Sequence, residues 1–188
     1  MKTNYKELEK QKVFKDLSDV ADRMGKDCYV VGGYVRDLLL GIPSNDIDIV
    51  VVGSGIRVAE AYQELVGGEL TVYKSYGTAM VKSGEGLEVE FVGARKESYV
   101  RGSRNPIVEE GTLQDDLTRR DFTINSMAIC LNKSRFGELV DPFGGVQDIE
   151  NGILRTPTDP GITFGDDPLR ILRCIRFATR LNFRIDET

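Results

Sequence analysis

Two aspartates separated by one residue stand in the apolar stretch DIDIVVV, at positions 46 to 52. If this stretch forms a strand, its period of two puts Asp46 and Asp48 on one face and the intervening isoleucine on the other. Neighbouring carboxylates repel each other unless a cation lies between them. Oxygen ligands on one rigid edge suit Mg²⁺, which binds between carboxylates and substrate phosphates. The pair predicts a magnesium site, with a solvated strand edge as the alternative for a DxD taken alone.

A glycine pair precedes these aspartates in the sequence. CYVV (28–31) is typical of a strand, Gly32-Gly33 of a tight turn, and YVRDLLL (34–40) of a two-turn helix that ends at a glycine. Glycines let the backbone approach an anion, and a helix N-terminus presents free N–H groups and a positive dipole end. Arg36, one turn into the helix, can reach the same anion. Beside the aspartates, this pattern favours a phosphate site over a plain turn with a surface arginine.

A third acid follows from the alternation in LEVEFV, residues 87 to 92. Glu88 and Glu90 share one face of the expected strand. We assign Glu90 to a two-metal site with Asp46 and Asp48, and interpret Glu88 as a solvated neighbour. In such a site one ion activates an attacking hydroxyl, and both ions stabilise an in-line displacement at phosphorus.

The segment RRDFTIN (119–125) gathers charged and amide side chains beside apolar ones. The guanidinium of Arg120 matches phosphate oxygens, and Asp121 or Asn125 can hold ribose hydroxyls. The alternative is a helix start with Asp121 as its cap and solvated arginines. The segment alone does not separate a nucleotide site from this simpler interpretation.

A helix is predicted from Pro168 onward, because Asp167 before a proline is a typical N-cap. Three arginines follow at every third position and form a drifting basic stripe beside an apolar one; they are Arg170, Arg173 and Arg176. Few acids accompany this stripe, although the chain as a whole is acidic. The stripe therefore favours an anionic partner over a solvated helix face.

Asp167 and Arg170 lie one helical turn apart and offer an acceptor and a donor on nearly the same face. Cytosine and adenine each present an amino donor beside a ring-nitrogen acceptor, which match this pair. Uracil and guanine present a carbonyl beside a ring N–H and do not. The pair predicts a protein template for C and A.

The remaining pattern indicates a mixed α/β or α+β protein. Apolar side chains recur at helical spacing within residues 4–24, which predicts an amphipathic helix. Strands are predicted at 70–73, 78–81 and 87–93, in addition to those at 28–31 and 46–52. The stretch 98–112 lacks either period and is predicted to be a long mobile loop, which is often functional. A boundary is expected near residues 156 to 160, where TPTDPG interrupts the pattern.

Composition limits the kind of protein. The net charge is −5 and the pI about 5.0, so any nucleic-acid site must be local. The chain contains no histidine, which excludes Ser-His and Cys-His triads and imidazole metal sites. Three cysteines without CxxC spacing argue for a reducing compartment, the cytoplasm by default. The sequence also shows neither a membrane span nor a signal peptide.

Five segments in this order resemble the class II tRNA nucleotidyltransferase and bacterial poly(A) polymerase family, whose best-known members add the CCA end to tRNA. The segments are GGYVRDLLLG, DID, RRDFTINSMAI, DPFGGVQDIENG and DDPLRILRCIRFATRL, within residues 28–183. The resemblance implies a metal at Asp46 and Asp48, triphosphate or sugar contacts from Gly33, Arg36 and Arg120, base selection by Asp167 and Arg170, and a continuation of the nucleotide site at Arg173 and Arg176. One departure is that the family's usual Glu-Asp pair is Asp166-Asp167 here.

The resemblance also implies a polymerase-β-like head, a mixed sheet flanked by helices, which runs into a helical neck. We expect the head at 1–157 and the start of the neck at 158–188. Family members continue into helical domains that hold tRNA, so we expect this chain to be a catalytic fragment. The expected activity is Mg²⁺-dependent transfer of CMP and AMP from CTP and ATP to the 3′ end of tRNA. Poly(A) tailing, addition of only A or only C, and a non-catalytic nucleotide-binding module are the alternatives.

Overall fold

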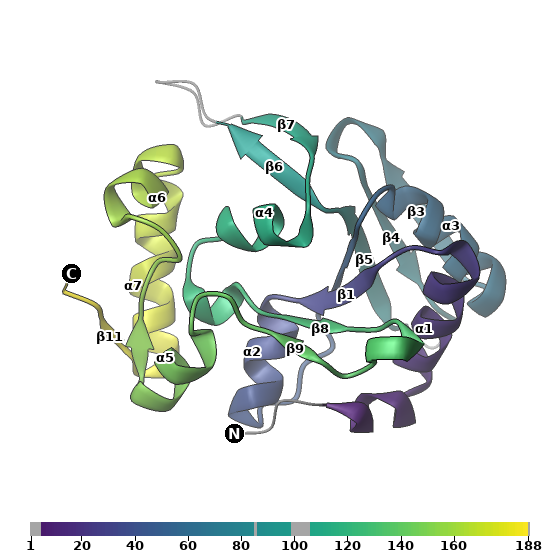
Figure 1. Cartoon of the computed structure of the whole chain (residues 1–188), viewed down its shortest axis with the longest axis horizontal. Helices are drawn as coiled ribbons and strands as arrows, with labels where there is room; N and C mark the ends of the chain where they lie inside the picture. The colour runs from purple at the N-terminus through teal and green to yellow at the C-terminus, as the bar shows by residue number, and fades with distance from the viewer. Residues whose placement is uncertain (1–4, 85, 99–105, 188) are drawn as a thin grey trace.

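A mixed sheet forms the centre of the computed structural model, which describes residues 5–84, 86–98 and 106–187. Within these residues the sheet has seven strands in the order β3-β4-β5-β2-β1-β8-β9 (Figure 1). Its strands are β1 Cys28–Val31, β2 Ile47–Val51, β3 Glu69–Tyr73, β4 Thr78–Lys82, β5 Glu88–Gly93, β8 Ala128–Cys130 and β9 Leu139–Val140. Only β2 and β5 pair in parallel among these described strands. The five strands predicted from the sequence are confirmed to within one residue at each end.

Helices cover both faces of the sheet. They are α1 Lys12–Met24, α2 Gly33–Leu40, α3 Gly55–Val66, α4 Leu113–Thr118, α5 Gly145–Asn151, α6 Pro160–Asp166 and α7 Leu169–Leu181, with short 3-10 turns at η1 Lys6–Lys10, η2 Lys74–Tyr76, η3 Thr123–Asn125 and η4 Lys133–Arg135. Ile49 and Phe91 belong to the larger core, which also contains residues of α1 and α3. Val50 points to the opposite face and packs in a smaller core with Leu117 of α4. The expected mixed sheet flanked by helices is confirmed.

The predicted helix 4–24 is wrong in its first half, and its first residue lies outside the described part of the chain. A 3-10 turn, η1, is separated from α1 by Gln11, whose backbone is extended. Leu8 and Phe14 are both buried. Six residues of continuous α-helix would rotate these side chains about 240° apart. The break at Gln11 lets both side chains enter the core.

The predicted loop 98–112 is also partly wrong. Arg95–Ser98 (β6) and Ile107–Glu110 (β7) pair as antiparallel strands, and Thr112 begins the cap of α4. All four side chains of β7 are exposed, so the strand lacks the alternation on which the sequence prediction depended. Residues 99–105, the rest of the predicted loop, lie outside the described residues.

The predicted helices at 34–40 and from Pro168 are confirmed as α2 and α7. Gly41 ends α2 in a left-handed conformation, as expected for a helix C-terminus. Beyond the expected boundary, α7 packs beside α6. Arg184–Ile185 (β11) pairs in parallel with Ile153–Leu154 (β10), which precedes that boundary. The division into 1–157 and 158–188 stays a prediction. No helix in the described ranges is both long and apolar enough to span a membrane.

Candidate nucleotide site

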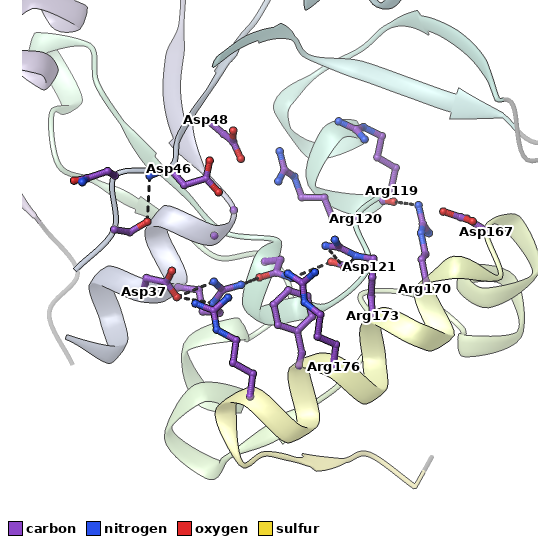
Figure 2. A pocket seen from close by; sticks show the side chains of 18 of the residues that line it. Asp37, Asp46, Asp48, Arg119, Arg120, Asp121, Asp167, Arg170, Arg173 and Arg176 are labelled. Atoms are coloured by element: carbon purple, nitrogen blue, oxygen red, sulfur yellow. Dashed lines mark hydrogen bonds and ion pairs between the residues drawn. The ribbon is translucent and has the colours of Figure 1, made fainter. Parts of the chain in front are cut away.

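A cleft of about 620 Å³ lies where the Gly32-Gly33 turn, the start of β2, the segment after α4 and one face of α7 meet. Every site residue predicted from the sequence lines it except Glu90; they are Gly32, Gly33, Arg36, Asp46, Asp48, Arg120, Asp121, Asn125, Asp167, Arg170, Arg173 and Arg176. Figure 2 shows Asp46 and Asp48 on one side of this cleft and the arginines of α7 across from them. The fold thus brings together residues as far apart in the sequence as Gly32 and Arg180.

The acidic side of the cleft is formed by β2 and β5. Asp48 lies in β2 directly opposite Glu90 of β5, and Asp46 immediately precedes β2. Glu90 lines a neighbouring hollow of about 160 Å³, which it shares with Asp48, Arg119 and Arg120. Glu88 forms an exposed ion pair with Lys82, which agrees with its interpretation as a solvated neighbour. The role assigned to Glu90 stays a prediction.

Asp48 is the member of this acidic group whose pKa is raised. Burial, together with the charges of Asp46 and Glu90, raises the pKa of Asp48 to about 6, while Arg120 acts in the opposite sense. In residues 5–84, 86–98 and 106–187, no three His, Cys, Asp or Glu side chains form a group that could hold a metal ion. Mg²⁺ usually keeps several water ligands, so an ion at Asp46 and Asp48 would take its other oxygen ligands from water and substrate phosphates.

The glycine turn lies against Arg120. Gly32 has φ 69° and ψ −128°, a backbone conformation that only glycine adopts readily. A Cβ on Gly32 would lie 2.8 Å from Nη1 of Arg120 and 3.9 Å from Oδ2 of Asp48. The missing side chain thus leaves room for a guanidinium beside the acidic group. The predicted neighbourhood of a glycine turn, an arginine and an aspartate is present.

Arg36 lines the cleft but is buried in a network rather than extended into open space. Its Nη2 lies 2.7 Å from Oδ1 of Asp37, and its Nη1 donates a 2.7 Å hydrogen bond to Oδ1 of Asn125. Asp37 was not predicted as a site residue. Adjacent residues on a helix do not usually face each other, so sequence spacing does not predict a pair between Arg36 and Asp37. The anion contact expected of Arg36 stays a prediction.

The network continues to α7. Asn125 donates from Nδ2 to Oδ1 of Asp121 over 3.0 Å, and Oδ2 of Asp121 lies 2.6 Å from Nη2 of Arg173. Asp121 also accepts a hydrogen bond from the backbone N–H of Phe122, so it combines a cap-like bond with a long-range ion pair. The basic stripe on α7 is therefore partly compensated by an acid from another segment.

Phe177 is an aromatic residue of the cleft that was not predicted as a site residue. Its ring centre lies 5.1 Å from the guanidinium carbon of Arg36, 5.3 Å from that of Arg173 and 5.5 Å from that of Arg176. The ring is 4% exposed and packs edge-on against Phe122. Three guanidiniums around one ring fit cation–π geometry. Sequence spacing could have indicated the contact with Arg173, because Phe177 is one turn from Arg173 on the same helix.

Asp116 is a second missed residue. It is fully buried and pairs with both Arg119 and Arg120. Burial acts to raise the pKa of Asp116, but Arg120 and Arg119 together hold that pKa below its ordinary value. Its spacing of three residues from Arg119 and four from Arg120, at a helix end, was the available sequence signal.

The predicted base-reading pair is placed at the other end of the cleft. Oδ1 of Asp167 accepts a 3.1 Å hydrogen bond from the N–H of Leu169. The N-cap of α7 is however Pro168, one residue after the position predicted from the sequence. Arg170 donates from Nη2 to the carbonyl of Arg119 over 2.7 Å and from Nη1 to the carbonyl of Thr163 over 3.3 Å. These bonds fix the Arg170 side chain at the cleft wall (Figure 2). Base reading by either residue stays a prediction.

The fold and the site together define a class. A mixed sheet flanked by helices carries an acidic group beside a glycine turn and faces an arginine-rich wall. This architecture matches the polymerase-β-like nucleotidyltransferase head of solved CCA-adding enzymes.

Comparison with known sequences identifies the family. Residues 28–155 match the poly A polymerase head domain, so the chain belongs to this family. It is 37% identical over 175 residues to the A-adding tRNA nucleotidyltransferase of Halalkalibacterium halodurans, an alignment that covers 93% of this chain and 40% of the relative. It is 44% identical over 160 residues to the A-adding enzyme of Aquifex aeolicus, with 85% and 19% covered. A CC-adding tRNA nucleotidyltransferase of Deinococcus radiodurans is 38% identical over 167 residues, with 88% and 44% covered.

Solved structures agree. An apo form of a CCA-adding enzyme superposes with a TM-score of 0.89 at 40% identity, covering all of this chain and 46% of that one. The Thermotoga maritima CCA-adding enzyme complexed with tRNA gives 0.83 at 38%, with 100% and 44% covered. A complex of a CCA-adding enzyme with ATP gives 0.82 at 43%, with 93% and 38% covered. The resemblance drawn from the sequence is confirmed. The chain spans less than half the length of the relatives it matches.

Proposed function

We propose that this chain is the catalytic part of a metal-dependent nucleotidyltransferase that transfers CMP or AMP from CTP or ATP to the 3′ end of tRNA. The observation that carries the proposal is the convergence of the acids, the glycine turn and the arginines in one cleft. In the reaction, the 3′-hydroxyl of the RNA attacks the α-phosphorus and pyrophosphate leaves. The named substrates of the related proteins, tRNA and ATP, support this assignment.

The acidic side of the cleft fits Mg²⁺. Asp46 and Asp48 supply hard oxygen ligands, and the raised pKa of Asp48 marks a carboxylate whose charge lacks full compensation from the protein. When bound, the metal would polarise the phosphate oxygens and favour ionisation of the attacking hydroxyl. Glu90, opposite Asp48, is the proposed third acid.

The basic side of the cleft fits the rest of the nucleotide. Arg120 at the Gly32-Gly33 turn is proposed to bind the triphosphate together with the free N–H groups of α2. Asp121 and Asn125 are proposed to hold ribose hydroxyls. The guanidiniums of Arg36, Arg173 and Arg176 surround Phe177 and are proposed to continue the nucleotide site.

Base choice is assigned to Asp167 and Arg170 at the start of α7. Arginine has five N–H donors, and the two bonds to backbone carbonyls leave donors for a base. We propose that Asp167 and Arg170 select C and A over U and G. Differential scanning fluorimetry with Mg²⁺ tests it, because ATP and CTP should raise Tm while GTP and UTP should not. Stabilisation by GTP or UTP alone would refute the base assignment.

Activity on RNA tests the function itself. The expected result is Mg²⁺-dependent incorporation of labelled AMP or CMP into tRNA that lacks its CCA end, by a protein that contains this chain and the RNA-holding part of its relatives. Asp46→Ala should abolish incorporation, whereas Glu88→Gln, on an exposed acid paired with Lys82, should not. Incorporation that survives Asp46→Ala would exclude the metal assignment.

The products of the same assay separate the related activities. Addition of C, C and A, of A alone, of C alone or of a poly(A) tail would each leave a different 3′ end. Matches of 37–44% identity to enzymes named A-adding and CC-adding do not choose among them. A non-catalytic nucleotide-binding module is disfavoured, because Asp46 and Asp48 are both present in the cleft.

We also propose a head at 1–157 and the start of a neck at 158–188. The family match ends at residue 155, which supports a boundary there. The cytoplasm is the proposed compartment, because the three cysteines are free thiols, all buried.

A further inference from the structure

We propose that Asp116 is a positioning residue of the nucleotide site, which holds the guanidinium of Arg120 against the Gly32 turn. This inference rests on the proposed function, since it needs Arg120 to bind the triphosphate. Asp116 itself is not in contact with the cleft, so it would act only through the arginine.

The geometry of the two ion pairs supports this role. Nε and Nη2 of Arg120 donate to the same oxygen of Asp116, Oδ2, over 3.1 and 2.9 Å. The other oxygen, Oδ1, accepts from Nε and Nη2 of Arg119. Each carboxylate oxygen thus holds one arginine fork. For Arg120 this leaves Nη1 as the nitrogen that Asp116 does not engage.

That remaining nitrogen points to the side of the cleft that carries Gly32 and Asp48. Nη1 of Arg120 lies 2.8 Å from the position that a Cβ on Gly32 would occupy. The position is also 3.9 Å from Oδ2 of Asp48. A guanidinium fixed at two nitrogens can rotate little, so its third nitrogen is presented in one direction. Asp116 therefore determines where Arg120 donates.

Burial makes the arrangement rigid. Asp116 has no exposed surface, and the side chains of Arg119 and Arg120 are 17% and 16% exposed. Arg119 is also bonded to Glu97 of β6 over 3.2 Å. Arg95 also pairs with Glu97, over 2.9 Å, so three guanidiniums and two carboxylates leave one net positive charge, which suits an anionic ligand.

The test is a double-mutant cycle on binding by the 188-residue chain. Isothermal titration calorimetry with Mg²⁺ would measure ATP, inorganic tripolyphosphate and, as a phosphate-free control, adenosine. Asp116→Asn should weaken binding of ATP and tripolyphosphate roughly ten- to hundredfold, the loss typical of a charge-assisted hydrogen bond. Adenosine binding should change less than twofold. The double variant D116N/R120Q should bind no more weakly than R120Q alone.

Two outcomes would overturn the inference. If D116N and R120Q weaken binding additively, or if adenosine binding falls as much as tripolyphosphate binding, Asp116 acts through general stability instead of through Arg120. Failure of the wild-type chain to bind Mg–ATP would instead refute the proposed function. The two failures are therefore distinguishable.

A second pair of variants covers the case in which D116N does not fold, because it leaves two guanidiniums facing a neutral amide. Arg119→Gln keeps the Asp116–Arg120 pair, and D116N/R119Q removes that pair while leaving only one arginine to accommodate. The inference requires D116N/R119Q to bind tripolyphosphate roughly ten- to hundredfold more weakly than R119Q. Equal binding by these two variants would overturn it.

Discussion

Asp48 illustrates how a binding residue can oppose folding. It lies beside Asp46, opposite Glu90 in the register of the sheet, and its burial together with these two charges raises its pKa to about 6. Because the folded-state pKa is above the unfolded value, the folded chain binds more protons, and stability falls as pH rises between the two values. The ionised residue is thus destabilising until a cation compensates it.

The first prediction follows from the loss of stability that ionised Asp48 causes. Asp48→Asn should stabilise the metal-free chain by about 1–3 kcal/mol at pH 7.5, since one pKa unit corresponds to about 1.4 kcal/mol. The gain should shrink as pH falls through about 6 toward 4, where Asp48 itself becomes protonated. Urea unfolding in EDTA at several pH values measures this. Glu88→Gln is the matched control, because Glu88 is an exposed acid in β5, and it should change stability by less than about 0.5 kcal/mol. A destabilised D48N chain would contradict the prediction.

At the residue scale, local spacing was enough to find the groups that face the cleft. The two-residue period located Asp46 and Asp48, and the strand–glycine–helix pattern located Gly32 and Arg36. Their partners could not be found in this way. The pairing of Asp121 with Arg173 joins residues 52 apart in the sequence, and no periodicity within one element indicates which distant side chain will meet another.

At the scale of single elements, the helix α4 positions the arginine pair although it has only six residues. Thr112 accepts from the N–H of Asp115 and donates its own N–H to that side chain, which is a capping box. Thr112 falls within the predicted loop 98–112, so this helix was not predicted from the sequence. Short elements are held by such caps and by tertiary packing, which a periodicity search does not detect.

A second prediction tests this cap. Thr112→Ala should lower the free energy of unfolding by about 1 kcal/mol, because it removes the oxygen that accepts from the backbone N–H of Asp115. Thr112→Ser is the matched control and should be nearly neutral, since serine keeps the hydroxyl. Chemical denaturation of both variants measures the difference. Equal losses in the two variants would mean that the methyl group, and not the cap, matters.

A third prediction concerns α7, which carries both the basic stripe and Phe177. Phe177→Leu should lower the free energy of unfolding by about 1–2 kcal/mol, less than the 3–5 kcal/mol typical of Phe→Ala. It should also weaken ATP binding several-fold, because Arg36, Arg173 and Arg176 lose their common ring. Leu172→Ala on the same helix is the control: Leu172 is 63% exposed and should change neither quantity appreciably. Unchanged ATP binding in F177L would show that the ring does not organise these arginines.

At the scale of the whole molecule, the cleft is positively charged although the chain is acidic overall. The chain has a net charge of −5, yet seven arginines and five aspartates line the cleft, a local charge of +2. Composition alone predicted that any nucleic-acid site must be local, and the cleft satisfies that condition. The position of the site could not be predicted from composition, because it depends on α7 packing across from β2.

The charge distribution leads to the last prediction. Binding of Mg–ATP should weaken roughly tenfold between 50 and 500 mM KCl, because screening shortens the range of the attraction between the arginines and the phosphates. Arg180→Gln should weaken binding and reduce its salt dependence, since Arg180 lines the cleft at the end of α7. Arg184→Gln removes the same charge from an exposed residue that does not line the cleft, and should leave both the affinity and the salt dependence unchanged. Equal effects of the two variants would show that the field of the whole chain, and not the cleft, attracts the nucleotide.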